Sequence, residues 1–287
     1  MPELGPRFRG KLSLKLDGSS LGGSAGPATV LKFMKNNSRR EWLLRLTAAG
    51  ALSGATSLLG ADTKADSPPR GAMARRLRVV VTGGHPGDPE YGCGGTIARY
   101  ADLGHDVVLL YLNRGDPNET SVRPPSEIRT AEATRACALL KARPAFVGQI
   151  DGHAVLDQDH FAAFRRMLEA ERPDVVFTHW PIDNHADHRA MSGLVHDAWV
   201  KMRHSFAMYY YEVSTGEDTL QFAPTHWVDI SATEERKRQA CFAHGSQSPD
   251  RYYAMQSTVT RMRGLERGCS QAEGFVRLAV GPDVALP

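Results

Sequence analysis

Short apolar runs alternate with helical stretches along most of this 287-residue chain, and this alternation constrains its fold more than any other feature. The valine-rich run at residues 77–81 is typical of a strand buried on both faces, and residues 94–104 have helical periodicity. Such alternation predicts an α/β fold with a doubly wound, mostly parallel sheet and helices on both faces. Further strands are expected at 107–112, 145–147, 175–178 and 208–211, and further helices at 126–141, 159–170 and 189–202.

Near the C-terminus, the spacing of Ser231 and Glu234 matches a capping box, in which each side chain bonds the other residue's backbone amide. The pattern predicts a helix that starts at Ser231 and runs to about His244. Gly245 would then take the positive φ of a helix C-cap.

The first third of the chain has a different character. Arg39 and Arg40 precede Trp42 and a low-charge stretch of Leu, Ala, Gly and Ser, which is typical of a twin-arginine export signal. The apolar part is too short and mild for a spanning helix of ~20 residues, so we expect cleavage and export to the periplasm or beyond the cell. The predicted organisation is an upstream extension (1–33) that precedes the true start, a signal peptide (34–61), a linker (62–73) and a catalytic domain (74–287).

The net charge of +3 comes from the leader. Setting aside the nine Lys/Arg and three Asp/Glu of residues 1–61 leaves a net charge of −3. A mildly acidic domain without a basic face gives no reason to expect a nucleic-acid partner. The four cysteines lack C-x-x-C spacing, so structural thiols are expected rather than a disulfide framework.

Two His/Asp clusters each follow an apolar run. His85 and Asp88 come after the first predicted strand, and residues 183–188, including His185 and His188, come after the fourth. In an open α/β sheet such loops meet at the carboxyl ends of the strands, so their separation in sequence is no obstacle. Three N/O ligands with one open position are typical of catalytic zinc, although iron or cobalt would also suit this set. The glycines near His85 do not keep the G-x-G-x-x-G register of a dinucleotide site.

These residues carry a family resemblance. The chain resembles the PIG-L/LmbE family of zinc-dependent N-acetylglucosaminyl deacetylases, whose members share a Rossmann-like, doubly wound fold. The resemblance spans most of residues 77–247. Five motifs occur in the same order, at residues 79–96, 113–116, 129–132, 178–189 and 244–247.

The resemblance implies that His85, Asp88 and His188 hold the metal. His185 would lie beside it, oriented by Asp187, and act in proton transfer or oxyanion stabilisation. Three further residues are candidates for contact with the sugar: Arg129 and Asp151, which match substrate-facing positions of relatives, and Trp180, which precedes the second cluster and could wall the pocket.

One position departs from the family pattern. Relatives commonly have His-Pro-Asp-Asp, in which the first Asp takes a proton from the zinc-bound water, and this chain has Gly87 there. Losing a positioned base typically costs ~10²–10⁴ in rate. Glu90 is the preferred replacement, with Asp183 as the alternative; an exposed loop carboxylate without a catalytic role is an equally acceptable interpretation of Glu90.

Two functions follow. The first is hydrolysis of the amide of an N-acetylated amino sugar or glycoconjugate by metal-activated water. The second, because of Gly87, is a metal- and sugar-binding module without activity. The sequence leaves the substrate and the oligomeric state undefined.

Overall fold

The computed structural model describes residues 75–115 and 126–287. The predicted extension, signal peptide and linker therefore lie outside the described residues. Within the described part of the chain, no helix has the length and apolar character needed to cross a membrane.

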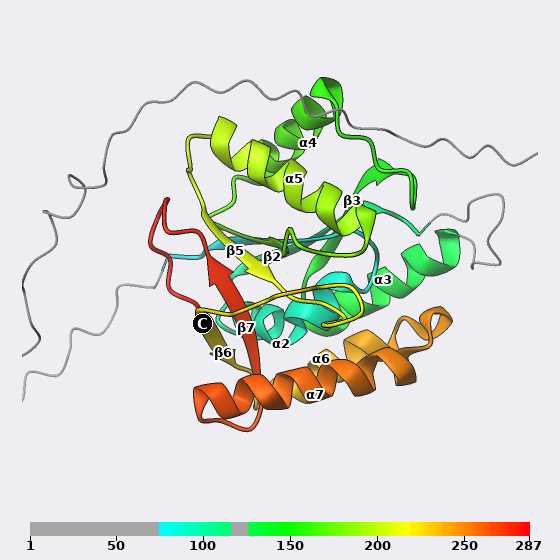
Figure 1. Ribbon diagram of the computed structural model, residues 1–287, viewed down its shortest axis with the longest axis vertical. Helices are drawn as coiled ribbons and strands as arrows, with labels where there is room; N and C mark the ends of the chain where they lie inside the picture. Colours follow the sequence, from blue (N-terminus) through cyan, green and yellow to red (C-terminus); the bar gives the residue numbers. More distant parts are fainter. Residues whose placement is uncertain (1–74, 116–125) are drawn as a thin grey trace, which may run out of the picture. The chain divides into compact units, whose positions relative to one another are not determined.

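The described residues form a central sheet with helices on both faces (Figure 1), which confirms the predicted Rossmann-like fold. The strand order is β3-β2-β1-β4-β5-β7-β6. The first five strands are parallel, and β7 runs antiparallel to both of its neighbours. The bounds are β1 Arg78–Gly83, β2 Asp106–Asn113, β3 Arg143–Gln149, β4 Val175–His179, β5 Ala207–Tyr211, β6 His226–Asp229 and β7 Ala272–Arg277.

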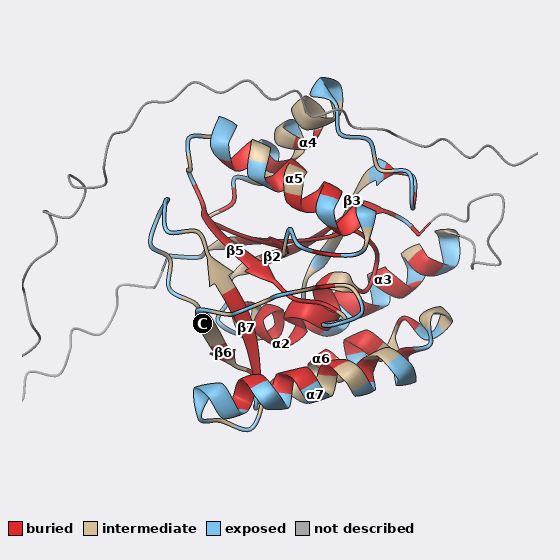
Figure 2. Cartoon of the chain, viewed as in Figure 1, coloured by how far each residue is buried: buried red, intermediate tan, exposed pale blue. Residues whose placement is uncertain are grey.

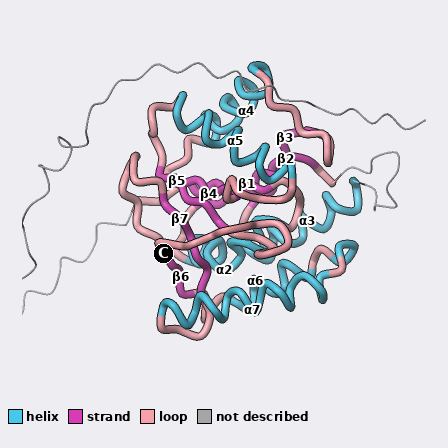
Figure 3. Tube along the Cα trace, in the orientation of Figure 1, coloured by secondary structure: helices cyan, strands magenta, loops and turns pink. Residues whose placement is uncertain are grey.

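Two hydrophobic cores lie on opposite faces of the sheet, because successive strand side chains alternate between the faces. Val79 faces the core under α2, α3 and α6, whereas Val80 faces the core under α4 and α5. Figure 2 shows the buried surfaces turned toward the sheet, and Figure 3 shows the strands between the helical layers. The helices are α2 Asp88–Asp102, α3 Ser126–Leu140, α4 Gln158–Glu171, α5 Ala186–Lys201, α6 Glu234–Phe242 and α7 Pro249–Arg267, with a 3-10 turn, η1, at Gly245–Gln247.

Helix α2 begins six residues earlier than the predicted start at residue 94. Pro89 lies in its first turn, where a missing N–H costs nothing. Glycines that look like loop residues in the sequence are helical because neighbours pack too close for a side chain. A Cβ at Gly92 would lie 2.3 Å from the Tyr211 ring, and one at Gly95 would lie 2.5 Å from Ile230.

The predicted capping box is wrong. Ser231 Oγ donates to Asp229 instead, and α6 begins after Thr233, whose hydroxyl donates to the Gly95 carbonyl. Helix α6 ends at Phe242, and Gly245 lies in η1 without a positive φ. The N-cap of α6 is therefore Thr233, two residues after the predicted Ser231.

Candidate active site

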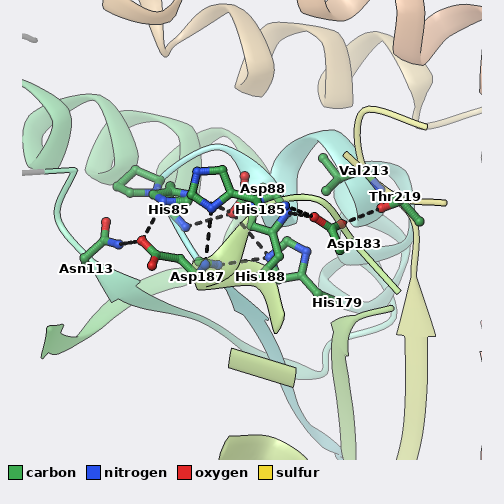
Figure 4. Close-up of polar contacts among 12 residues, drawn as sticks. His85, Asp88, Asn113, His179, Asp183, His185, Asp187, His188, Val213 and Thr219 are labelled. Carbon is green, nitrogen blue, oxygen red and sulfur yellow. Dashed lines mark hydrogen bonds and ion pairs between the residues drawn. The ribbon is translucent and has the colours of Figure 1, made fainter. Parts of the chain in front are cut away.

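The two ligand loops lie side by side because β1 and β4 are neighbours in the sheet. The chain leaves β1 toward β2 on one side and reaches β4 on the other, so the strand order reverses between them, and a crevice forms at such a point. His85 and Asp88 lie between β1 and the first turn of α2, and His188 lies in the first turn of α5. Figure 4 shows these side chains converging.

Asp88 lies within a few ångströms of both predicted histidine ligands. Asp88 Oδ2 is 3.3 Å from His85 Nδ1 and 3.2 Å from His188 Nε2. Donor atoms around a tetrahedral zinc, with bonds of about 2.0–2.1 Å, lie about 3.3 Å apart. Both distances from Asp88 therefore match the spacing of donor atoms around a divalent cation. Several three-residue groups with this potential overlap here, including one of His85, His185 and His188 and one that adds His179 to Asp88 and His188.

Each predicted histidine ligand has a carboxylate near the ring nitrogen that does not face Asp88. His85 Nε2 lies 3.1 Å from Asp187 Oδ2 and 3.2 Å from Asp151 Oδ1, and His188 Nδ1 lies 3.1 Å from Asp183 Oδ1. Such carboxylates fix the tautomer and orientation of a metal-binding imidazole. The remaining nitrogens, Nδ1 of His85 and Nε2 of His188, face Asp88.

The charges of the cluster favour a cation. Burial opposes protonation of His188, but Asp88 and Asp183 outweigh it and raise the pKa of His188 to about 9. The pKa of His85 is also raised against burial by Asp151, Asp187 and Asp88. The pKa of Asp88 is lowered, again against burial, mainly by His188. The carboxylates of the cluster therefore favour positive charge on His85 and His188, and a metal ion that binds there would compete with protons for the ring nitrogens.

His179 supports this cluster from below the crevice. Its Nε2 accepts the N–H of Gly84 at 3.0 Å and lies 3.3 Å from Asp88 Oδ2. Burial, together with the charge of His188, lowers the pKa of His179 to about 4, so the ring is neutral. Its ring stacks on that of His188 at 3.9 Å between centroids.

The Asp187 carboxylate does not orient His185, contrary to expectation. Its Nδ1 accepts the backbone N–H of Asp187 at 3.2 Å and caps α5, while the Asp187 carboxylate lies on His85. Burial, then the positive charges of His85 and His188, lower the pKa of His185. The neutral ring therefore carries its proton on Nε2, the nitrogen left for the cavity, which makes it a hydrogen-bond donor.

A cavity of about 320 Å³ opens over the cluster, at the lower end of the range of about 300–1,000 Å³ for small-molecule sites. The ligand loops form one wall, with His85, Asp88 and His185 exposed to it. Tyr91 and Tyr252, whose rings meet edge to face, provide aromatic surface. The other charged or titratable lining residues are Arg129, Asp218 and His244.

Of the three residues predicted to contact the substrate, Arg129 lines the cavity, whereas Asp151 and Trp180 do not. Arg129 lines the cavity, donates to the Pro86 carbonyl at 3.1 Å and lies 3.9 Å from Asp151. Asp151 is buried behind His85, which it helps to orient. Trp180, contrary to expectation, lies outside the lining: it packs against Tyr210 and Phe222, because its apolar ring completes the core under α5.

Glu90 is neither an exposed carboxylate nor part of the cavity wall. It is fully buried, and its Oε1 accepts from Tyr111 Oη at 2.7 Å and pairs with His244 Nε2 at 2.9 Å. Glu90 lies in the first turn of α2, and its partner His244 lines the cavity. Asp183, the alternative base, is committed to His188 and Thr219 and is likewise absent from the lining.

Sequence reasoning missed the roles of His244 and Asp218. His244 belongs to a motif whose position the structure explains, because Glu132 accepts from the N–H and the hydroxyl of Ser246 at 2.8 and 2.7 Å. Four of the five motifs therefore contribute residues to the lining of one cavity, those at residues 79–96, 129–132, 178–189 and 244–247. Asp218 lies in a polar loop after β5 and had no signal in the sequence.

In doubly wound domains, the crevice at the strand reversal is where ligands bind, and here it carries a His/Asp cluster. Residues 80–199 match the family model PIG-L: GlcNAc-PI de-N-acetylase. This match confirms the resemblance of these residues to the PIG-L family.

Solved structures share the fold. The conserved protein TT1542 from Thermus thermophilus is 29% identical, with a TM-score of 0.62 over 73% of this chain and 97% of that one. N,N'-diacetylchitobiose deacetylase from Pyrococcus horikoshii, complexed with its inhibitor MPG, is 23% identical (TM-score 0.61; 70% and 83% covered). GalB, the 4-carboxy-2-hydroxymuconate hydratase from Pseudomonas putida, is 19% identical (TM-score 0.64; 73% and 100% covered).

Proposed function

We propose that this chain is a metal-dependent hydrolase that removes an N-acetyl, or related N-acyl, group from an N-acetylglucosamine-type amino sugar or its conjugate. The observation that carries the proposal is the spacing of 3.2–3.3 Å between Asp88 and the two histidine ligands beside an open cavity. The description of the matching family model, a de-N-acetylase of GlcNAc-PI, supports the same reaction type.

His85, Asp88 and His188 would hold the ion, for which zinc is our first candidate. A bound divalent ion supplies a Lewis acid and lowers the pKa of a coordinated water. Asp151, Asp183 and Asp187 keep the two imidazoles in the tautomers that leave the correct nitrogen free.

His185 and the cavity walls act on the substrate. The Nε2–H of His185 donates to the oxygen of the amide carbonyl as negative charge develops on it. Arg129 offers a cation to polar groups of the sugar or its conjugate, and the Tyr252 ring offers a face for the sugar ring.

Metal analysis combined with an acetate assay tests this proposal. Purified protein should contain about one zinc or other divalent ion per chain and release acetate from N-acetylglucosamine or N,N'-diacetylchitobiose. His188→Ala should lose the ion and reduce turnover by at least about 10³-fold, because it removes a ligand. His196→Ala is the matched control, since His196 is an exposed histidine of the same helix. Full metal content and turnover in His188→Ala would discard the ligand assignment.

A second candidate function is a metal- and sugar-binding module without activity, favoured by Gly87. Calorimetry separates the two. Binding of N-acetylglucosamine derivatives without acetate release from any acylated sugar would favour the module. Acetate release by the wild type would exclude it.

The partner we propose is a small N-acetylated sugar or glycoconjugate rather than a nucleic acid. We also propose that the domain works outside the cytoplasm, after export by the twin-arginine pathway. Arg39 and Arg40 support this, since a paired arginine ahead of a mild apolar stretch is typical of that route. Replacing both with lysine and following the protein by cell fractionation tests the proposal.

A further inference from the structure

Gly87 leaves the site without the carboxylate that would accept a proton from the attacking water. Among the described residues that line the cavity, two carry a carboxylate: Asp88 and Asp218. Asp88 is committed to the cation. Glu90 and Asp183, the replacements considered from the sequence, do not reach the cavity. Asp218 is thus the remaining lining carboxylate.

Backbone and side-chain bonds fix the turn that carries Asp218 onto the second ligand loop. Asp218 N–H donates to the Ser214 carbonyl at 2.8 Å, and the Asp218 carbonyl accepts from Asn184 N–H at 2.9 Å. The next residue, Thr219, donates to Asp183 Oδ2 at 3.0 Å, and Asp183 in turn holds His188. The turn is therefore built as part of the metal loop, and it places Asp218 at the cavity by a continuous set of hydrogen bonds.

The environment of Asp218 suits proton transfer. The residue is half-buried and open to the cavity. Burial raises the pKa of Asp218, and the nearby negative charges of Asp183 and Asp88 add to this effect, whereas His188 and a side-chain hydrogen bond with Ser214 oppose it. A carboxyl with a raised pKa both accepts and returns a proton more readily near neutral pH.

We propose that Asp218 is the proton-transfer residue of this site, in place of the carboxylate missing at position 87. Its carboxylate takes one proton from the attacking water as the water oxygen bonds to the amide carbon. The same proton then passes to the amide nitrogen while the C–N bond breaks, so that acetate and the free amine leave. This inference rests on the proposed function.

Asp218→Asn tests the proposal, because it keeps the shape of the side chain and removes its charge. The turnover number for acetate release should fall by about 10²-fold or more, with metal content unchanged. Affinity for glucosamine, measured by calorimetry, should fall about tenfold, because the carboxylate faces the ammonium of the product. Affinity for N-acetylglucosamine, which has no such charge, should stay within about threefold.

Glu217→Gln is the matched control, since Glu217 is the exposed neighbour whose side chain pairs with Arg251. It should leave all these quantities unchanged. Asp218→Asn with wild-type turnover and wild-type glucosamine affinity would overturn the proposal while leaving the deacetylase function intact. If the wild type releases no acetate, the proposed function fails, and an unchanged glucosamine affinity in Asp218→Asn then refutes the placement of Asp218 as well. A change in glucosamine affinity would instead support that placement.

Discussion

The two loops that carry the predicted metal ligands are stabilised in different ways. The loop after β4 enters α5 through His185, whose side chain caps the helix, and carries two carboxylates that orient histidines. The loop after β1 enters α2 through Gly87, with φ at 115° and no side-chain cap. Its histidine ligand, His85, is oriented by residues from other loops.

This difference shows that the second loop organises the first. Asp187 reaches across to His85 Nε2, and His179 at the end of β4 accepts the N–H of Gly84. A glycine-rich loop with little structure of its own can therefore hold a ligand, because its partner loop is fully bonded. The lack of a carboxylate at position 87 therefore does not disturb the positions of the predicted ligands, although it removes a proton acceptor.

The largest effect on stability that we predict concerns pH, and it tests whether both loops carry positive charge in the metal-free protein. The pKa of His188 rises to about 9 in the folded, metal-free protein, from 6.5 when unfolded. Protonated His188 therefore stabilises the metal-free fold fully below pH 6.5, and this contribution disappears as the pH rises to about 9. The free energy of unfolding of chelator-treated protein should fall by up to about 3 kcal/mol across this window.

Urea unfolding at several pH values measures this change. His188→Gln should make the dependence shallower but not abolish it, because the pKa of His85 is raised as well. A wild-type dependence no steeper than that of His188→Gln would show that the second loop does not carry this charge.

The ligand loops could be predicted from the sequence because their signals are local. Valine-rich runs marked β1 and β4, and the His/Asp clusters follow them directly. The partners of each carboxylate could not be predicted, since Asp187 contacts His85 only through the pairing of β1 with β4. Asp218 was missed for the same reason.

The two C-terminal strands, β6 and β7, were missed for a different reason. Strand β7 hides its pattern because Glu273 is buried in it, where it pairs with Lys237 at 2.6 Å and accepts the N–H groups of Gly95 and Thr96. Strand β6 has only four residues and no apolar run. Charged residues at core positions and very short strands remove the alternation from which strands are predicted.

A smaller effect is expected from Asp187→Asn, which tests directly whether the second loop holds the first. Removing its charge should weaken metal affinity by about 10–100-fold, or about 1.4–2.7 kcal/mol, through the orientation of His85. Metal titration of the variant with a competing chelator measures this change.

A double-mutant cycle locates the effect. In a His85→Ala background, Asp187→Asn should weaken metal binding by much less than it does alone, because the side chain it orients is gone. Equal losses in both backgrounds would mean that Asp187 acts elsewhere, for example through Asn113, which donates to the same oxygen at 3.0 Å.

The smallest effects that we predict are changes in the free energy of unfolding caused by glycine substitutions at the two helices that follow these loops. Gly87→Ala should destabilise the fold by about 1–2 kcal/mol, since φ of 115° is unfavourable for any residue with a Cβ. The cause is the backbone rather than crowding, because the nearest atom to such a Cβ is 3.6 Å away on Tyr91. Gly193→Ala in α5 should instead stabilise it by up to about 1 kcal/mol, as the added methyl meets only Leu156 at 3.8 Å. Thermal unfolding of both variants gives the comparison; a stabilising Gly87→Ala would mean that the first loop is free to adopt an ordinary helix cap, and that its dependence on the second loop is weaker than argued.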